Sequence, residues 1–202
     1  KASTNKSLLK QINKISQKAI SVFKANEIKE KQKRIKNSIL KTKALDSIGI
    51  SLTMSSGYKL FKKENNNKFW FQRETQKGSV NLLIYTLPLY KKNPNLESII
   101  ALRDSIGKAF VPGRNKDSYL ITEKAYEPYF FKTKVSSLNT FETRGTWEVV
   151  NDYMAGPFLN YYIKDLKNNR TIVIEGFVFS PSVRKREYLV ELEAIVRSLK
   201  VF

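Results

Sequence analysis

The N-terminal part of the chain carries apolar side chains at helical spacing. In a region without Gly or Pro they follow one another at intervals that suit one face of a helix: Leu8, Ile12, Ile15, Ala19, Val22, Ile28, Ile35 and Ile39. This pattern predicts one long helix or two helices in succession. Its apolar stripe needs a covering surface, which is either the rest of the chain or a partner. Residues 46–49 end the pattern.

From residue 50 onward, apolar and polar positions alternate with a period of two, which predicts strands. Residues 80–87 are apolar on both faces, as expected for a central strand that is covered on both sides. Asn-rich and Gly-containing segments at 65–67, 77–78 and 167–169 supply turns. The predicted strands are 50–53, 58–62, 68–74, 79–89, 129–135, 141–150, 158–164 and 170–180.

Two further helices interrupt or follow these strands. Residues 95–107 carry apolar side chains at helical spacing, and an irregular loop is expected from Pro112 to about Tyr126. Ser180 and Pro181 suit the N-cap and first position of a last helix, which has one apolar face from Tyr188 to Leu199.

This order of elements predicts an α+β fold, a largely antiparallel sheet with helices on both faces. We expect two parts: a basic helical arm over residues 1–48, as the tail of a missing upstream half, and an α+β sandwich over residues 49–202. No run of apolar residues is long enough for a membrane-spanning helix.

The chain has neither cysteine nor histidine. Disulfides, thiolate metal sites and cysteine nucleophiles are therefore excluded, and so are the commonest general base and metal ligand. No set of residues identifies a reaction. We expect no metal, no cofactor and no catalytic residue, which favours a function other than catalysis.

The formal charge of +19 is unevenly distributed. Residues 1–48 carry 13 Lys and Arg against 3 acidic residues, and the remaining 154 residues carry 24 against 15. Such a charge suits an anionic partner such as nucleic acid, lipid head groups or an acidic glycan, or the arm is simply the solvated face of a lysine-rich helix. We favour the solvated face, and nucleic-acid binding is the third of our functional hypotheses.

The strand 141–150 has one largely apolar face and one charged face. Trp147 belongs to the apolar face, and Arg144 and Glu148 belong to the charged face. Glu175 lies in a strand that is otherwise apolar. A buried Glu175 would need a cationic partner, and Arg103, Arg144 or Arg186 could provide it. Structural ion pairing and a functional site both remain open.

Two further residues complete the candidates for an interaction or ligand site. Arg114 lies in the loop 108–119, where it could face an anion, although the glycine spacing of a phosphate loop is missing. Met154 lies in residues 151–157, which we expect to reverse the chain, with Gly156 and Pro157 as turn residues. The candidates are Arg103, Arg114, Arg144, Trp147, Glu148, Met154, Glu175 and Arg186.

Several motifs resemble an uncharacterised family of Bacteroidetes envelope lipoproteins, the domain-of-unknown-function 4837 family. They are SIGISLTMSSGYKL, FWFQRE, LLIYTLPL, VPGR, ETRGTWEVVNDYMAGPFLNYYI and VIEGFVFSPSVRKREYLVELEAIVRSL, within residues 47–199. The order of elements is also similar to PsbP-like sandwiches, many of which are accessory subunits. The resemblance implies an outer-membrane lipoprotein whose lipid anchor lies outside this chain.

These observations lead to three functional hypotheses. The first is a non-enzymatic envelope lipoprotein domain that binds a partner protein or assembly. The second is an enzyme or binding protein for an envelope glycan or lipid that uses Arg144, Glu148 and Glu175. The third, nucleic-acid binding through the basic arm, is the least favoured.

Overall fold

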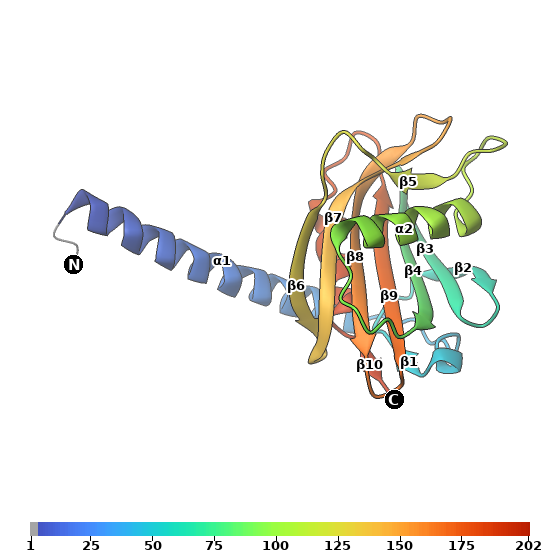
Figure 1. Ribbon diagram of the computed structural model, residues 1–202, viewed down its shortest axis with the longest axis horizontal. Helices are drawn as coiled ribbons and strands as arrows, with labels where there is room; N and C mark the ends of the chain where they lie inside the picture. The colour runs from blue at the N-terminus through green and yellow to red at the C-terminus, as the bar shows by residue number, and fades with distance from the viewer. Residues whose placement is uncertain (1–3) are drawn as a thin grey trace.

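A twisted antiparallel sheet forms the centre of the molecule in the computed structural model, which describes residues 4–202 apart from the side chain of residue 17 (Figure 1). Its order is β2-β3-β4-β9-β8-β7-β5, and β6 also pairs with β7. The strands are β2 (Lys59–Glu64), β3 (Lys68–Thr75), β4 (Gly78–Pro88), β5 (Leu120–Thr122), β6 (Tyr129–Val135), β7 (Leu138–Val149), β8 (Ala155–Asp165) and β9 (Arg170–Phe179).

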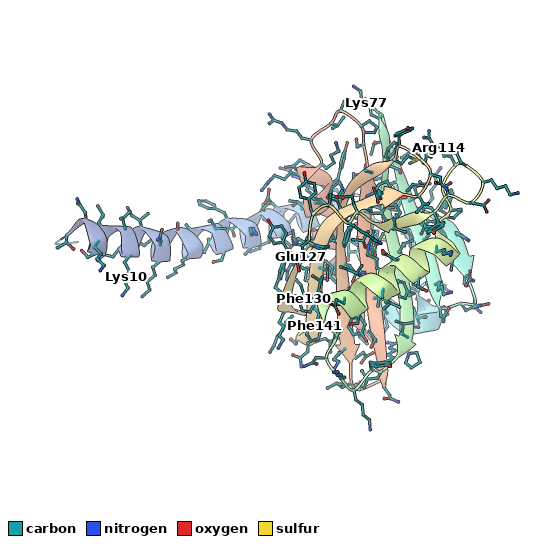
Figure 2. All side chains as sticks on the ribbon, turned by 45° about the horizontal axis from the view of Figure 1, so that its top comes forward. Lys10, Lys77, Arg114, Glu127, Phe130 and Phe141 are labelled. Carbon is teal, nitrogen blue, oxygen red and sulfur yellow. The ribbon has the colours of Figure 1, made fainter. Side chains whose placement is uncertain are left out.

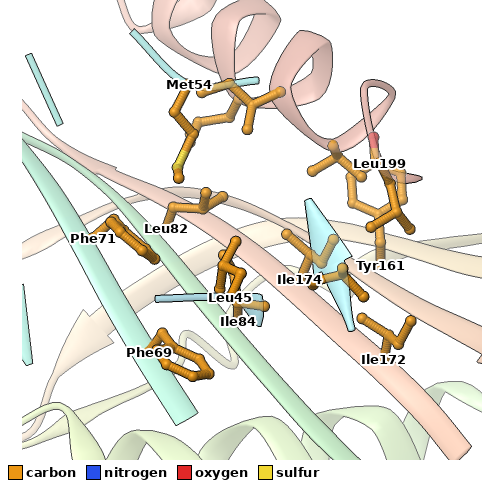
Figure 3. Packing of buried hydrophobic residues seen from close by; sticks show 14 of the residues in the cluster. Leu45, Met54, Phe69, Phe71, Leu82, Ile84, Tyr161, Ile172, Ile174 and Leu199 are labelled. Atoms are coloured by element: carbon orange, nitrogen blue, oxygen red, sulfur yellow. The ribbon is translucent and has the colours of Figure 1, made fainter. Parts of the chain in front are cut away.

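Helices cover both faces of this sheet, which confirms the predicted α+β architecture. On one face α2 (Leu96–Phe110) packs through Ile99 and Phe110 on side chains that include Trp70, Trp147 and Tyr162. On the other face lie α3 (Arg186–Val196) and the second half of α1 (Asn5–Lys36). The core on this face contains side chains of α3, of α1 and of the central strands. Figure 3 shows the part formed by the strands, including Phe71 of β3, Leu82 of β4 and Ile174 of β9.

The predicted N-terminal helix is a single long helix, α1. A capping box at Thr4 begins it, and its first half projects from the sandwich (Figure 1). Ile35 is buried in the core and Ile28 packs against it. The covering surface of the apolar stripe is therefore the body of the chain for these residues. The large apolar residues from Leu8 to Phe23 remain exposed. Residues 1–3 of the predicted arm lie outside the described residues.

Several predicted boundaries were wrong. Helix α1 ends at Lys36, so Ile39 lies beyond it in an isolated bridge with Ser55. The strand predicted at 50–53 is β1 (Ile50–Ser51), which follows the short helix η1 (Asp46–Ile48) and forms a separate two-stranded sheet with β10 (Lys200–Val201). The loop predicted after Pro112 contains β5.

The last helix begins later than predicted. Ser182 has a φ of 60°, a conformation that a right-handed helix cannot contain. Ser180 and Pro181 therefore belong to the connection before α3, and Lys185 is the N-cap residue.

Gly156 and Pro157 are not turn residues. They belong to β8, where they pair with Trp147 and Thr146 of β7. The chain reverses earlier, at Asn151, which has a φ of 59°. Glycine is needed at 156 because a Cβ atom there would lie 2.0 Å from the carbonyl oxygen of Val178. Pro157 is tolerated because the pairing of β8 with β9 begins only at Phe158.

Candidate functional site

A groove runs between α1 and the edge of the sheet at β6. It has a volume of about 790 Å³, with walls from residues 21–32 of α1 and from residues 129–136, that is, β6 and the residue after it. Charged side chains of β7 and α3 form its floor: Glu142, Arg144, Glu193 and Arg197. It is larger than the three other cavities found among the described residues.

Strand β6 leaves one of its edges unpaired. It pairs with β7 from Tyr129 to Val135 and with no other strand of the described chain. Successive side chains of β6 point to opposite faces of the sheet, and side chains from both faces line the groove. This is expected where a groove follows the edge of a strand. Tyr129 and Phe131 stand on its rim with exposed fractions of 77% and 41%. Exposed aromatic side chains are typical of sites that bind other proteins.

The floor of the groove is a network of ion pairs around Arg144. Its Nε atom lies 2.5 Å from Glu142 Oε1, and its Nη2 atom lies 2.6 Å from Glu193 Oε2. Arg197 Nε donates to the other oxygen of Glu193 over 2.9 Å. The hydroxyl of Tyr161 donates to Glu142 over 3.0 Å. Both carboxylates are therefore held in place by cationic or hydroxyl donors.

The pKa shifts fit this arrangement. Burial opposes the charge on Arg144, but the anionic neighbours outweigh it and raise the pKa of the guanidinium. Burial alone would raise the pKa of Glu193, but hydrogen bonding and charge from Arg144 and Arg197 lower it below the ordinary value. Burial and Glu142 raise the pKa of Tyr161. None of these groups is tuned toward proton transfer near neutral pH.

The walls of the groove are basic. Six basic and two acidic side chains line it, and Lys24, Lys29, Lys132 and Lys134 make no ion pair within the described part of the chain. Apolar contact surface comes from Ile28 and Val135. The groove therefore suits a ligand that combines acidic and apolar groups.

Arg186 lies beside this groove and not within it. Its guanidinium holds Glu27 of α1 through two hydrogen bonds of 2.5 and 2.7 Å. The pair bounds a cavity of about 130 Å³ that Arg144 also lines. Arg186 is therefore a surface link between α3 and α1, and Lys31 and Glu187 form a second link of 3.1 Å.

Glu175 is buried on the opposite face of the sheet, beneath α2. Of the predicted partners, Arg103 is the one that reaches it, with Nη2 at 2.9 Å from Oε1. Asn160 donates to the other oxygen over 3.1 Å, and the Arg103 guanidinium stacks 3.8 Å from the centre of the Phe158 ring. Burial raises the pKa of Glu175, although Arg103 and Asn160 oppose this shift.

The sheet therefore separates residues that the second hypothesis placed together. Arg144 pairs with Leu159 of β8, which in turn pairs with Gly176 of β9, and a Cβ atom at Gly176 would meet Leu192 of α3. Glu175 precedes Gly176 on β9, so its side chain lies on the opposite face of the sheet and faces α2. Glu148 is half-buried on β7 and makes no ion pair within the described residues. Arg144, Glu148 and Glu175 do not form one site.

Arg114, Trp147 and Met154 lie together in a third place. They line a cavity of about 180 Å³ at the end of α2. Arg114 is exposed and binds Asp152 through two bonds of 3.0 and 2.8 Å, which lower the pKa of that carboxyl. Trp147 is buried and packs edge-on against Phe177. This cluster fastens the 112–119 loop to the β7–β8 turn.

Sequence reasoning missed the groove itself. Glu142 was not considered as a partner of Arg144, and Glu193 was not considered at all. The signal for the first was present, because Glu142 and Arg144 stand two apart on one strand and share a face. Nothing in the sequence places Glu193 or α1 near them.

The fold and the groove define an α+β sandwich domain with a long N-terminal helix. The model of a protein family described as a domain of unknown function, DUF4837, matches residues 11–198. The chain belongs to this family. The match begins within α1, so it extends further toward the N-terminus than the motifs quoted above.

Solved structures show a more distant similarity. A Mog1 point mutant and the Saccharomyces cerevisiae Ran-binding protein Mog1p each give a TM-score of 0.45, at 9% and 8% sequence identity respectively. In both cases the alignment covers 76% of this chain and 90% of the other. No curated protein matches the chain.

Within residues 4–202, no helix is long and apolar enough to cross a membrane, and no group of three or more carboxylates could hold a metal ion.

Proposed function

We propose that this chain is a non-enzymatic accessory protein of the cell envelope, which binds a partner protein along the unpaired edge of β6. The observation that carries the proposal is the groove of about 790 Å³ that follows this edge. An extended peptide can add a strand to such an edge through main-chain hydrogen bonds, while side-chain pockets select its sequence.

The geometry of β6 supports strand addition. Seven residues, Tyr129 to Val135, are paired on one side only. Proteins usually block such edges with a helix, a bulge or charged side chains. Here α1 stands across the groove and leaves room beside the strand, while Lys132 and Lys134 discourage pairing with a second copy of the same basic edge. A partner strand of opposite charge would not be repelled.

The side chains define the chemistry of the partner. Lysines on both walls favour acidic residues, and Ile28, Val135 and Phe131 favour apolar residues at alternate positions. The Arg144 network is already neutralised by Glu142 and Glu193. It therefore serves as a preformed floor and does not need an anion from the ligand.

The cellular place of this interaction is also a proposal. It rests on the resemblance of the chain to envelope lipoproteins, which are anchored by a lipid. Metabolic labelling of the full gene product with a radioactive fatty acid tests it. Incorporation of label and recovery in the outer-membrane fraction are expected, and an unlabelled, cytoplasmic product would contradict the envelope assignment.

Site-specific crosslinking tests the groove. A photoreactive phenylalanine is placed at Tyr129 or Phe131 in the native host, and in a control at Tyr153, which is fully exposed on the β7–β8 turn. We expect one partner band from the groove positions and not from the control position. Replacement of Lys132 and Lys134 by glutamate should reduce this band about tenfold or more, because the charge complementarity is reversed.

The matched control is the double replacement of Lys59 and Lys63 by glutamate. These exposed lysines lie on β2, the strand at the other edge of the sheet, and the charge change is the same. This control should crosslink as the wild type does. Equal loss in both variants would indicate a general charge effect, and equal labelling from Tyr153 would indicate a chance contact; either result would overturn the groove as the binding site.

A further inference from the structure

The first half of α1 is amphipathic, although none of it contacts the sandwich. Figure 2 shows Lys10 far from the body of the molecule, on a segment that projects freely. The exposed apolar residues here include Leu9 at 62%, Ile15 at 65% and Phe23 at 72% exposure. Such a concentration of exposed apolar side chains needs an explanation beyond the groove, because residues 5–20 do not line it.

The helical geometry sorts these residues by face. With 3.6 residues per turn, the apolar side chains of residues 8–23 fall within about 160° of the helix circumference. We call this set the apolar face: Leu8, Leu9, Ile12, Ile15, Ala19, Ile20, Val22 and Phe23. All lysines of residues 5–26 fall in the remaining arc: Lys6, Lys10, Lys14, Lys18 and Lys24. No acidic residue occurs before Glu27.

This face differs from the one that α1 turns toward the body. Ile28, Gln32 and Ile35 approach the core or α3, and Gln32 donates to the carbonyl oxygen of Ala194 over 3.0 Å. Toward the N-terminus, the same face of the helix contains Ser21 and Lys18 and none of the residues of the apolar face. The apolar face therefore does not continue the packing of α1 on the sandwich.

We infer that the projecting segment of α1, residues 5–23, lies on an anionic lipid surface. A broad apolar face opposite a lysine face is the pattern of a helix that lies in a membrane interface, with its apolar side among the acyl chains. Lysines at the border of such a helix interact with negatively charged headgroups, each adding to the affinity. This inference does not rest on the proposed strand-binding groove.

Charge decides between a lipid surface and a second copy of α1. In a two-helix coil, the positions that flank the apolar seam usually carry residues of opposite charge on the two helices. Here those positions hold Leu9, Gln11, Ser16, Lys18 and Phe23, with no acid among them. Two such helices would form no compensating charge pair beside the seam and would leave part of the apolar face uncovered. A membrane that carries negative charge can bury the apolar face among its acyl chains and bind the lysines through its headgroups.

Vesicle binding of the full chain tests the inference. The probes are vesicles of phosphatidylcholine alone and vesicles in which about a third of the lipid is phosphatidylglycerol. We expect partitioning about tenfold or more in favour of the anionic vesicles, with a strong decrease at high salt. A single-stranded oligonucleotide serves as a second anionic probe, and sedimentation without lipid measures self-association.

Two variants and a control separate the possible occupants. The first replaces Leu9, Ile12 and Phe23 by glutamine, and the second replaces Lys6, Lys10, Lys14 and Lys18 by glutamine. The control replaces the exposed lysines 41, 59, 63 and 77, so it loses the same charge elsewhere. Both α1 variants should lose anionic-vesicle binding about tenfold or more, and the control should retain it. All three should unfold at the wild-type temperature, because these side chains are exposed.

Other outcomes would overturn the inference. Vesicle binding that survives replacement of the apolar residues would indicate only a general attraction of the basic chain to anions, and tighter binding to the oligonucleotide would favour nucleic acid. A dimer in lipid-free solution that dissociates in the first variant would identify a second copy as the occupant. Equal loss in the control variant would show that net charge, and not this helix, is responsible.

Discussion

At the scale of single residues, the buried pair of Arg103 and Glu175 has the largest expected effect on stability. Both side chains are almost fully buried, with exposed fractions of 1% and 2%. Replacement of Arg103 by leucine would leave the Glu175 carboxylate beneath α2 without its cation. We expect this to reduce the free energy of unfolding by about 3–5 kcal/mol, measured by urea denaturation.

The double variant supplies the control for this pair. If Glu175 is also replaced by leucine, no unpaired charge is left, and replacement of a buried pair by apolar residues is often tolerated. The double variant should therefore be more stable than Arg103→Leu alone. If it is less stable by the sum of the two single effects, Arg103 and Glu175 are not coupled and our account of the pair fails.

Glu193 gives a prediction of pH dependence. Its folded-state pKa lies below the ordinary value of 4.5 because Arg144 and Arg197 outweigh burial. A lowered pKa means that the carboxylate stabilises the fold above the unfolded-state pKa, and that this contribution is lost as the pH falls through the folded-state pKa. Glu193→Gln should cost about 1.5–3 kcal/mol at neutral pH and much less in acid.

Urea denaturation at about pH 7 and about pH 3.5 measures this difference. The matched control is Glu74→Gln on β3, which is exposed and makes no ion pair with the described residues. Its effect on the free energy of unfolding should be small at both pH values. A cost for Glu193→Gln that is the same in acid and at neutral pH would show that lost packing, and not charge, explains the destabilisation.

Sequence reasoning at this scale identified residue types better than partners. The position of Glu175 in an apolar strand left burial and exposure both open, with a cation required if it is buried, and the structure shows it buried against Arg103, one of the three named arginines. Arg144 and Glu148 were placed correctly on a charged face, but the partners of Arg144 are Glu142 and Glu193. The second of these comes from a helix 49 positions away, and local spacing holds no information about such a contact.

At the scale of elements, α2 is fixed against the sheet by a close approach at Gly107. A Cβ atom there would lie 2.1 Å from the carbonyl oxygen of Leu120 in β5. Helix propensity alone predicts that Gly107→Ala gains up to about 1 kcal/mol. The clash involves backbone, which cannot move aside like a flexible side chain, and overpacking of this kind costs about 1–3 kcal/mol or more. We expect net destabilisation in thermal or urea unfolding.

Ser105→Ala is the matched control in the same helix. Ser105 is exposed, so only propensity acts, and a gain of a few tenths of a kcal/mol is expected. If Gly107→Ala also stabilises the protein, α2 does not approach β5 as closely as the structure indicates.

Close backbone contacts also limited how well the sequence predicted strands and turns. Strand alternation and the apolar run in β4 predicted the sheet well, because burial on one or both faces produces those patterns directly. Gly156 was assigned to a turn on its residue type, but the glycine is required by the approach of the Val178 carbonyl group inside the sheet. A start of α3 at Ser180 was wrong because residue types did not reveal the positive φ of Ser182.

At the scale of the whole molecule, the two halves of α1 differ: the second half packs on the sandwich and the first half projects from it. Its second half is tied to α3 by Ile35 in the core and by the ion pairs Arg186–Glu27 and Lys31–Glu187. Its first half projects away from the sandwich (Figure 1). Sequence analysis treated the apolar residues of both halves as one stripe, although those of the second half lie on a different face of the helix.

This division predicts different effects for two N-terminal deletions. Removal of residues 1–23 takes away no residue of the described core, so the unfolding temperature should stay within about 2 °C of the wild type. Removal of residues 1–36 also uncovers the core beside α3 and deletes Ile35, whose burial alone contributes about 1.5–3 kcal/mol. We expect this second deletion to lower the unfolding temperature by roughly 5 °C or more, or to prevent folding.

A point variant keeps this test informative if the longer deletion does not fold. Ile35→Ala in the full chain should cost about 2–5 kcal/mol, whereas Ile15→Ala in the projecting segment should change stability by less than about 0.5 kcal/mol. Equal effects at the two positions would mean that α1 acts as one unit, and that its first half is held by contacts within the molecule. The projecting segment would then not be free to reach a membrane, so the same measurement also bears on the lipid-surface inference.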